Sequence, residues 1–263
     1  ELGNHFRLKF EEVHSPHDVT QLENKYLKDK KEIGFAQLRG ELDQPGVDAL
    51  LFQRMNAKEE DDDRWVAVLN LQDSSAKAYW NRFHELSHRI AEPPQHILPF
   101  RRHKAEAHKP VEALMDSIAS DIAFFGPIFN PIVQRFAKTE RLSFEVVEVI
   151  RACYAPTASL LSTMKAIIKY WPKPAAALTA EFRGRRGNPD IDQALRITVQ
   201  GSNNATVNGQ LEFWSNMRVP TDSPIDIAFK TNSPINLQEN LGLWSTSKGK
   251  TLYAIDVYTS ARC

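Results

Sequence analysis

The feature that most constrains this chain is a five-residue word, HELSH, at residues 84–88. A helix advances about 100° per residue, so histidines four positions apart stand one above the other on a single face. Two imidazoles in that arrangement can reach one metal ion, and a glutamate beside the first can act as a base. The word therefore predicts a helix that carries His84 and His88 as metal ligands and Glu85 as the general base.

The residues around the word also follow the helical period. Apolar side chains recur at i, i+4, i+7 and i+11 and form one stripe, made by Tyr79, Phe83, Leu86 and Ile90. We expect this stripe to face the core, and His84 and His88 to lie on nearly the opposite side. Asp73 or Ser74 can cap the helix, and the Pro93-Pro94 pair can stop it.

A catalytic zinc usually has three protein ligands and an open position for water. A second helix is predicted after Pro110, up to Gly126-Pro127. Its expected core stripe consists of Val111, Leu114, Met115, Ile118, Ile122 and Phe125. Glu112 and Asp116 lie four apart on the edge of that stripe, where carboxylates are costly unless a cation compensates them. We therefore predict Glu112 as the third ligand and Asp116 as a hydrogen-bond partner of a ligand histidine.

Several of these polar residues could instead have an ordinary structural role. Glu112 could make an ordinary surface salt bridge. His96, His103 and His108 lie between the two helices and are expected to be solvated loop residues rather than ligands. The acidic run at 57–63 is expected to be a solvated turn.

The rest of the chain predicts an α+β protein whose character changes near the Pro-rich piece at 171–177. Before it, strands at 48–56 and 64–71 read as a hairpin, and helices are expected at 17–31, 143–154 and 158–171. After it, four strands are expected between Asn, Gly and Pro turns, at 194–201, 209–216, 225–231 and 251–260.

Composition limits the function classes. The 263 residues include 33 Lys+Arg and 33 Asp+Glu, a net charge of zero, which disfavours nucleic-acid binding through a global basic field. Two distant cysteines, Cys153 and Cys263, favour a reducing compartment. No apolar run approaches the roughly 18 residues of a membrane span, and the first residues lack a signal-peptide core. We therefore expect a cytoplasmic protein that does not engage a membrane.

Taken together, the motifs resemble those of the ImmA/IrrE family of bacterial metallopeptidases, over about residues 45 to 135. The resemblance lies in RWVAVLN before a helix with RFHELSH, followed by EALMDSIASDIAFFGP. The residues that match the family's motif positions are Asn70, His84, Glu85, His88, Glu112, Asp116 and Ala119. Ser87 replaces the usual glycine of the motif, and Arg82 stands closer to His84 than the family's arginine does. No transition-state donor is carried over for that reason.

This resemblance implies three parts of the IrrE-like or CapP-like kind. They are a zincin-like metallopeptidase domain at 1–135, a helix-turn-helix-like helical segment at 136–172 and a GAF-like sensor domain at 173–263. It implies zinc, with manganese as the other candidate, and a helix-turn-helix repressor that is cut at one site to relieve repression in a stress, DNA-damage or antiphage response. A small-molecule or nucleic-acid effector could act at the C-terminal domain.

Two other functions compete with the peptidase. A DNA-binding regulator could use a local basic excess, formed by Arg135, Lys138, Arg141, Arg151, Lys165 and Lys169. The stretch 181–189 is expected to be a basic contact patch for a protein partner or a solvated turn. A non-catalytic sensor could signal through the C-terminal part. The intact Glu85 favours an active enzyme over the sensor.

Overall fold

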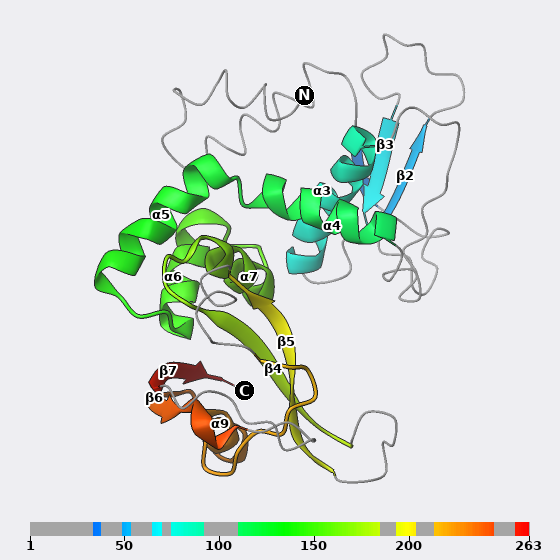
Figure 1. Cartoon of the computed structure of the whole chain (residues 1–263). Coiled ribbons are helices and arrows are strands. Elements are labelled where there is room, and N and C mark those ends of the chain that lie inside the picture. Colours follow the sequence, from blue (N-terminus) through cyan, green and yellow to red (C-terminus); the bar gives the residue numbers. More distant parts are fainter. Residues whose placement is uncertain are drawn as a thin grey trace. The chain divides into compact units, whose positions relative to one another are not determined.

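The structure, a computed structural model, describes residues 34–37, 49–53, 65–69, 75–91, 110–184, 193–203, 213–244 and 256–262. These residues form a mixed α+β protein, as predicted (Figure 1). The chain divides into two compact units, the first made of Glu1–Phe129 with Cys153–Ser159 and the second of Asn130–Ala152 with Leu160–Cys263. The predicted three-part division stays a prediction. Within the described part, no helix is long and apolar enough to cross a membrane.

The first unit contains a small mixed sheet. Strands β2 (Ala49–Gln53) and β3 (Trp65–Leu69) pair antiparallel, which confirms the two strands expected in a hairpin. Strand β1 (Gly34–Gln37) adds to the other side of β3 in parallel and was not predicted. The predicted helix at 17–31 and the acidic turn at 57–63 lie outside the described residues.

Two helices follow the sheet and confirm the helical periods in the sequence. The first, α3, runs from Ser75 to Ala91 and contacts β2, β3 and the second helix, α4 (Pro110–Ala123). Tyr79 ties the two helices together, because its hydroxyl donates to the carbonyl of Ala123 at 3.2 Å. The HELSH word thus lies on a helix that contacts both the sheet and α4.

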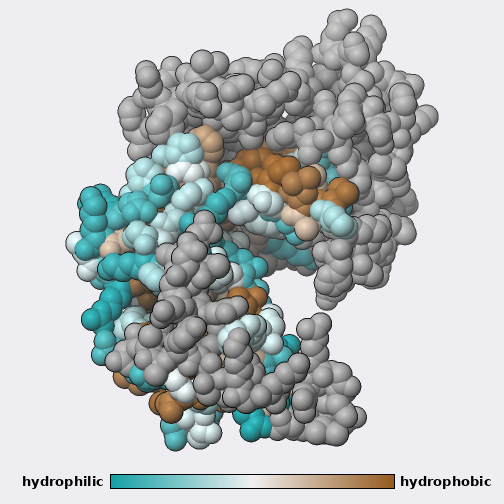
Figure 2. Space-filling model, viewed as in Figure 1, coloured by the Kyte–Doolittle hydropathy of each residue, from teal (hydrophilic) through white to brown (hydrophobic). Residues whose placement is uncertain are grey.

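The predicted core stripe of α4 is partly wrong. Met115 and Ile122 are buried, but Val111 is 49% and Leu114 is 55% exposed. The buried face also contains Ala119 and Ala123, so it is rotated toward Glu112 and away from the larger apolar side chains. Figure 2 shows the resulting apolar area on the surface over α4.

Three further helices lead from the first unit into the second. The helices α6 (Phe144–Tyr154) and α7 (Leu160–Tyr170) confirm two predictions. Helix α4 ends at Ala123, shortly before Gly126-Pro127, as expected, but helix α5 (Gly126–Thr139) was not predicted. Gly126 and Pro127 begin α5, and proline suits the first turn of a helix because its missing N–H has no partner to lose there.

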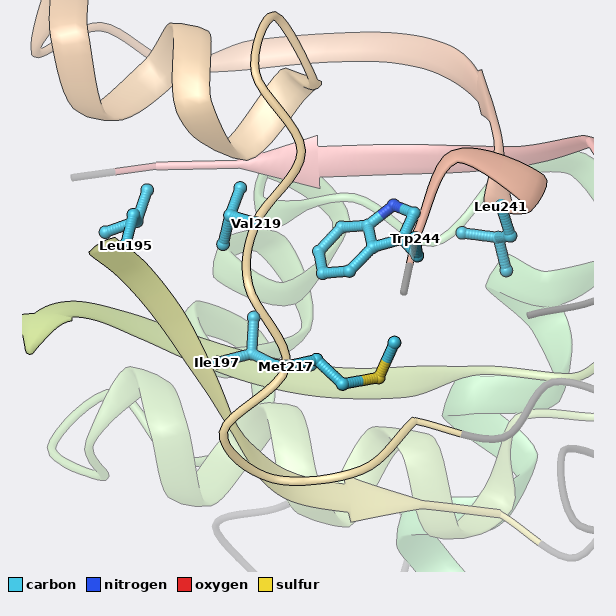
Figure 3. Packing of buried hydrophobic residues seen from close by; sticks show 6 residues of the cluster. All are labelled: Leu195, Ile197, Met217, Val219, Leu241 and Trp244. Atoms are coloured by element: carbon cyan, nitrogen blue, oxygen red, sulfur yellow. The ribbon is translucent and has the colours of Figure 1, made fainter. Parts of the chain in front are cut away.

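The second unit contains two antiparallel strand pairs. One is β4 (Ala176–Arg183) with β5 (Ala194–Ser202), and the other is β6 (Ile235–Asn240) with β7 (Asp256–Ala261). A buried apolar cluster joins β5 to the short 3₁₀ helix η3 (Leu241–Leu243), and its side chains face one another in Figure 3. The cluster consists of Leu195, Ile197, Met217, Val219, Leu241 and Trp244.

The strand predictions of this unit hold only in part. The expected strand at 194–201 is confirmed by β5, and that at 251–260 by β7 over its described residues. The described part of 209–216 is not a strand, while β4 and β6 were not predicted.

The expected strand at 225–231 is wrong, because these residues form helix α9 (Pro224–Thr231). Ser223 caps this helix by accepting from the N–H of Asp226, and Asn232 ends it in the left-handed region at φ 50°. Capping residues and an N-terminal proline outweigh the apolar alternation that suggested a strand.

Candidate metal centre

The central turns of α3 are buried except at Arg82. Asn81 and every residue from 83 to 88 are buried, with His84 at 2% and His88 at 1% exposed. Phe83 and Leu86 face the core as predicted. The histidines were expected on a face away from that core, and they are equally buried because α4 packs over them.

Three side chains converge between α3 and α4. His84 Nε2 lies 3.1 Å from Glu112 Oε2 and 3.1 Å from His88 Nε2. His88 Nε2 lies 3.7 Å from Glu112 Oε1. One ligand atom from each of the three residues falls within 4.8 Å of the others, so all three can reach a common point.

The spacing of these atoms fits a tetrahedral ion. Ligands bound to zinc at about 2.0–2.1 Å in a tetrahedron are separated from one another by about 3.3 Å. The measured separations of 3.1, 3.1 and 3.7 Å lie on either side of that value. His84, His88 and Glu112 are therefore arranged as three ligands of a tetrahedral cation would be.

The charges of the cluster favour a cation as well. Glu85 is 2% exposed, and the side chains of Glu112 and Asp116 are 16% and 38% exposed. If the three carboxylates are ionised and the two imidazoles are neutral, the cluster carries three negative charges. Buried charge of one sign is costly unless it is neutralised, and a divalent cation would cancel two of the three charges.

Asp116 sets the orientation of the first histidine. Its Oδ1 accepts a hydrogen bond from His84 Nδ1 at 2.9 Å. A proton held on Nδ1 leaves the lone pair of a neutral imidazole on Nε2, the atom that faces Glu112 and His88. A carboxylate behind a ligand histidine is the usual support of a protein metal site. Asp116 thus makes the contact that the sequence led us to expect.

Glu85 and Ser87 complete the buried turn. Glu85 follows His84 directly, so its side chain leaves the helix about 100° away from that ligand. Ser87, which stands where the ImmA/IrrE motif has glycine, is fully buried and donates its hydroxyl to the carbonyl of Phe83 at 2.7 Å. This bond to the residue four positions earlier satisfies the hydroxyl inside the helix, so the departure from the motif costs the site little.

Several predicted positions lie outside the described residues, namely Asn70, His96, His103 and His108. Arg82 is described, and its guanidinium lies over the ring of Phe83, 5.9 Å from the centroid. The core stripe expected for α4 included neither Ala119, which was named only as a position of the family motif, nor Ala123, and both are buried. These small residues, four apart, could have indicated the face on which another helix approaches closely.

Comparisons with known proteins assign no family to the chain. No family model matches the sequence, and no curated protein matches it either. Among solved structures, the chain is similar to a Mycobacterium tuberculosis transcriptional regulator, with a TM-score of 0.48 and 8% sequence identity. That similarity covers 98% of this chain and 74% of the other. What the structure supports is a buried His84, His88 and Glu112 group consistent with a metal site.

Proposed function

We propose that this chain is a metal-dependent endopeptidase with a zincin-like catalytic domain. One observation carries the proposal. Ligand atoms of His84, His88 and Glu112 lie within 4.8 Å of one another, and the buried Glu85 lies on the helix of the two histidines. Zinc is the preferred ion, because two histidines and a glutamate are a common catalytic zinc set, and manganese is the alternative.

The residues of the site have separate roles in this proposal. A divalent ion held by the three ligands would supply Lewis acidity and make a neighbouring water more acidic. Glu85 takes the proton from the attacking water and later delivers it to the departing amine of the cleaved peptide bond. Asp116 keeps His84 in the tautomer that presents Nε2.

The substrate that we propose is a helix-turn-helix repressor whose cleavage at one site relieves repression under stress. Its support is the resemblance of the motif residues to the ImmA/IrrE family. The same resemblance supports the helix-turn-helix-like segment at 136–172 and the GAF-like domain at 173–263 as proposals. The two distant cysteines support a cytoplasmic location as a further proposal.

The proposal is tested by incubating the purified chain with the repressor encoded beside it, with added zinc or manganese, and identifying fragments by mass spectrometry. We expect a single cut. Glu85→Gln should slow cutting by about 10²–10⁴-fold, the usual contribution of a general base. The matched control Glu140→Gln changes an exposed glutamate outside the cluster and should cut normally. Undiminished cutting by the Glu85→Gln protein would contradict the assigned mechanism.

The rival function, a DNA-binding regulator, gives a different result in the same preparation. Two of its basic residues have partners within the chain: Arg151 pairs with Glu148 at 2.6 Å, and Arg141 lies over the ring of Tyr258. If DNA binding were the main activity, the unmodified chain would not cut the repressor. The Glu85→Gln protein would still shift duplex DNA in a gel, and the shift would weaken with added salt.

A further inference from the structure

The second unit contains a cavity of about 380 Å³ between α7 and the end of β5. Its volume lies at the lower end of the range for small-molecule sites, which is roughly 300–1,000 Å³. The walls come from residues 165–171 on one side and 200–203 on the other. The cavity belongs to a different unit from the candidate metal centre, so the proposed peptidase does not account for it.

The floor of the cavity is held rigidly. Asn203 is 6% exposed, and its side-chain amide donates to the carbonyls of Trp171 and Lys173 at 2.9 and 2.7 Å. Its Oδ1 accepts from the N–H of Ala175 at 3.4 Å. These bonds tie the end of β5 to the segment after α7, so the shape of the cavity does not depend on a ligand being bound.

An irregularity in the β4–β5 ribbon opens the other wall. Ala177 pairs with Gly201 and Leu178 with Val199, so Gln200 is an extra residue in β5. Such a bulge redirects side chains and often lies beside a functional site. The next residue, Gly201, has no side chain, and a Cβ placed there would lie 3.8 Å from Lys165 Cγ, an ordinary contact. A residue larger than alanine at position 201 would therefore extend into the cavity.

The charge of the lining is positive. Lys165 and Lys169 lie four apart on one face of α7, where like charges disfavour the helix slightly. None of the residues that line the cavity, all of which are described, is acidic. The ammonium group of Lys169 lies over the ring of Tyr170, 5.5 Å from the centroid, and the side-chain amide of Gln200 donates to Thr179 at 2.9 Å. Two lysines and the hydroxyl of Ser202 around a concave space suit an anion with several acceptor oxygens.

We propose that this cavity binds the phosphate group of a small phosphorylated molecule, held by Lys165 and Lys169. A phosphate could also come from a nucleic-acid backbone, but a backbone needs a continuous basic track, whereas the two lysines border a single partly open cavity. Trp171 is only 5% exposed, which leaves little ring surface for stacking a base.

The test is calorimetric titration of the full chain with pyrophosphate at fixed ionic strength, in a chelating buffer so that no metal ion binds the probe. We expect saturable binding that weakens more than about tenfold in Lys165→Gln/Lys169→Gln, through loss of two charge-assisted contacts. The control Lys138→Gln/Lys230→Gln removes the same charge from exposed lysines that do not line the cavity, and it should bind as the unmodified chain does.

A second pair of variants keeps the charges and changes the space. Gly201→Val should abolish pyrophosphate binding, whereas Gly201→Ala, whose Cβ fits at an ordinary distance, should retain it. Absence of binding by the unmodified chain, or equal losses in the two lysine pairs, would overturn the proposal. Single-stranded DNA that binds more tightly than pyrophosphate, with the same dependence on Lys165 and Lys169, would overturn the small-molecule assignment.

Discussion

At the scale of single residues, His84 holds the candidate centre together. Its two ring nitrogens have different partners: Nδ1 donates to Asp116, and Nε2 faces Glu112 and His88. The ring is 2% exposed, so neither nitrogen can exchange its partner for bulk water without movement of a helix. The hydrogen bond to Asp116 thereby fixes the direction in which the lone pair on Nε2 of His84 points.

Removing the supporting carboxylate should weaken metal binding without abolishing it. In Asp116→Ala the three ligand atoms remain, but the Nδ1–H of His84 loses its acceptor. We expect the dissociation constant for zinc to rise about 10–100-fold, measured by competition with a chromophoric chelator. The matched control is Asp121→Ala, at an exposed position of the same helix. Equal zinc affinities of the two variants would show that Asp116 does not support the site.

At the scale of elements, the packing of α4 decides which of its apolar residues stabilise the protein. Met115 is 2% exposed and its neighbour Leu114 is 55% exposed. Met115→Ala should therefore lower the free energy of unfolding by about 2–5 kcal/mol, and Leu114→Ala by no more than about 0.5 kcal/mol. Urea denaturation of both variants measures the difference. A larger loss of unfolding free energy in Leu114→Ala than in Met115→Ala would show that Leu114 belongs to the core, as the sequence predicted.

The elements also show what the sequence could and could not predict. Periodicity and end signals predicted α3, α4, α6 and α7, because each is long enough for an apolar stripe to be read. The residues 225–231 are too few for that, and the capping by Ser223 and Asn232 that makes them helical is a local effect. The burial of His84 and His88 could not be predicted either, since it depends on α4, a separate element, closing over α3.

A second element-scale prediction concerns pH. Hydrogen bonds from Arg151, followed by the effect of Arg262, lower the pKa of the Glu148 carboxyl below its ordinary value of 4.5. Because the pKa is lowered in the folded state, the stabilisation is present above about pH 4.5 and is lost as the pH falls through the folded value. The side chain of Glu148 is 34% exposed, so the stabilisation is small.

Glu148→Gln should therefore lower the free energy of unfolding by less than about 1 kcal/mol at pH 7, and the difference should shrink as the pH falls below 4.5. Denaturant curves at neutral and acidic pH measure it. The Arg262→Met variant separates the effects of the two arginines, because it removes the 3.1 Å contact of Glu148 with Arg262 and leaves the contact with Arg151. If the loss of unfolding free energy caused by Glu148→Gln became larger at acidic pH, the predicted direction of the pKa shift would be contradicted.

At the scale of the whole molecule, the chain passes between the two units more than once. It leaves the first unit after Phe129 and returns to it at Cys153–Ser159. Tyr154 accounts for the return, since its hydroxyl accepts from the N–H of Phe125 at 3.1 Å and its ring contacts Phe124 and Phe129. A composition change along the sequence cannot reveal such a return, because the segment involved is short and lies within a helical region.

His84, His88, Glu112 and Asp116, which contact one another, all lie in the first unit. The central claim is that they hold a metal ion, and the metal content of the full chain tests it. The measurement is the number of zinc ions per chain after loading and exhaustive dialysis, by inductively coupled plasma mass spectrometry. We predict about one ion in the unmodified chain and in Glu85→Gln, and close to none in His88→Ala. A His88→Ala protein that retains the ion, or an unmodified chain that holds none, would contradict the account.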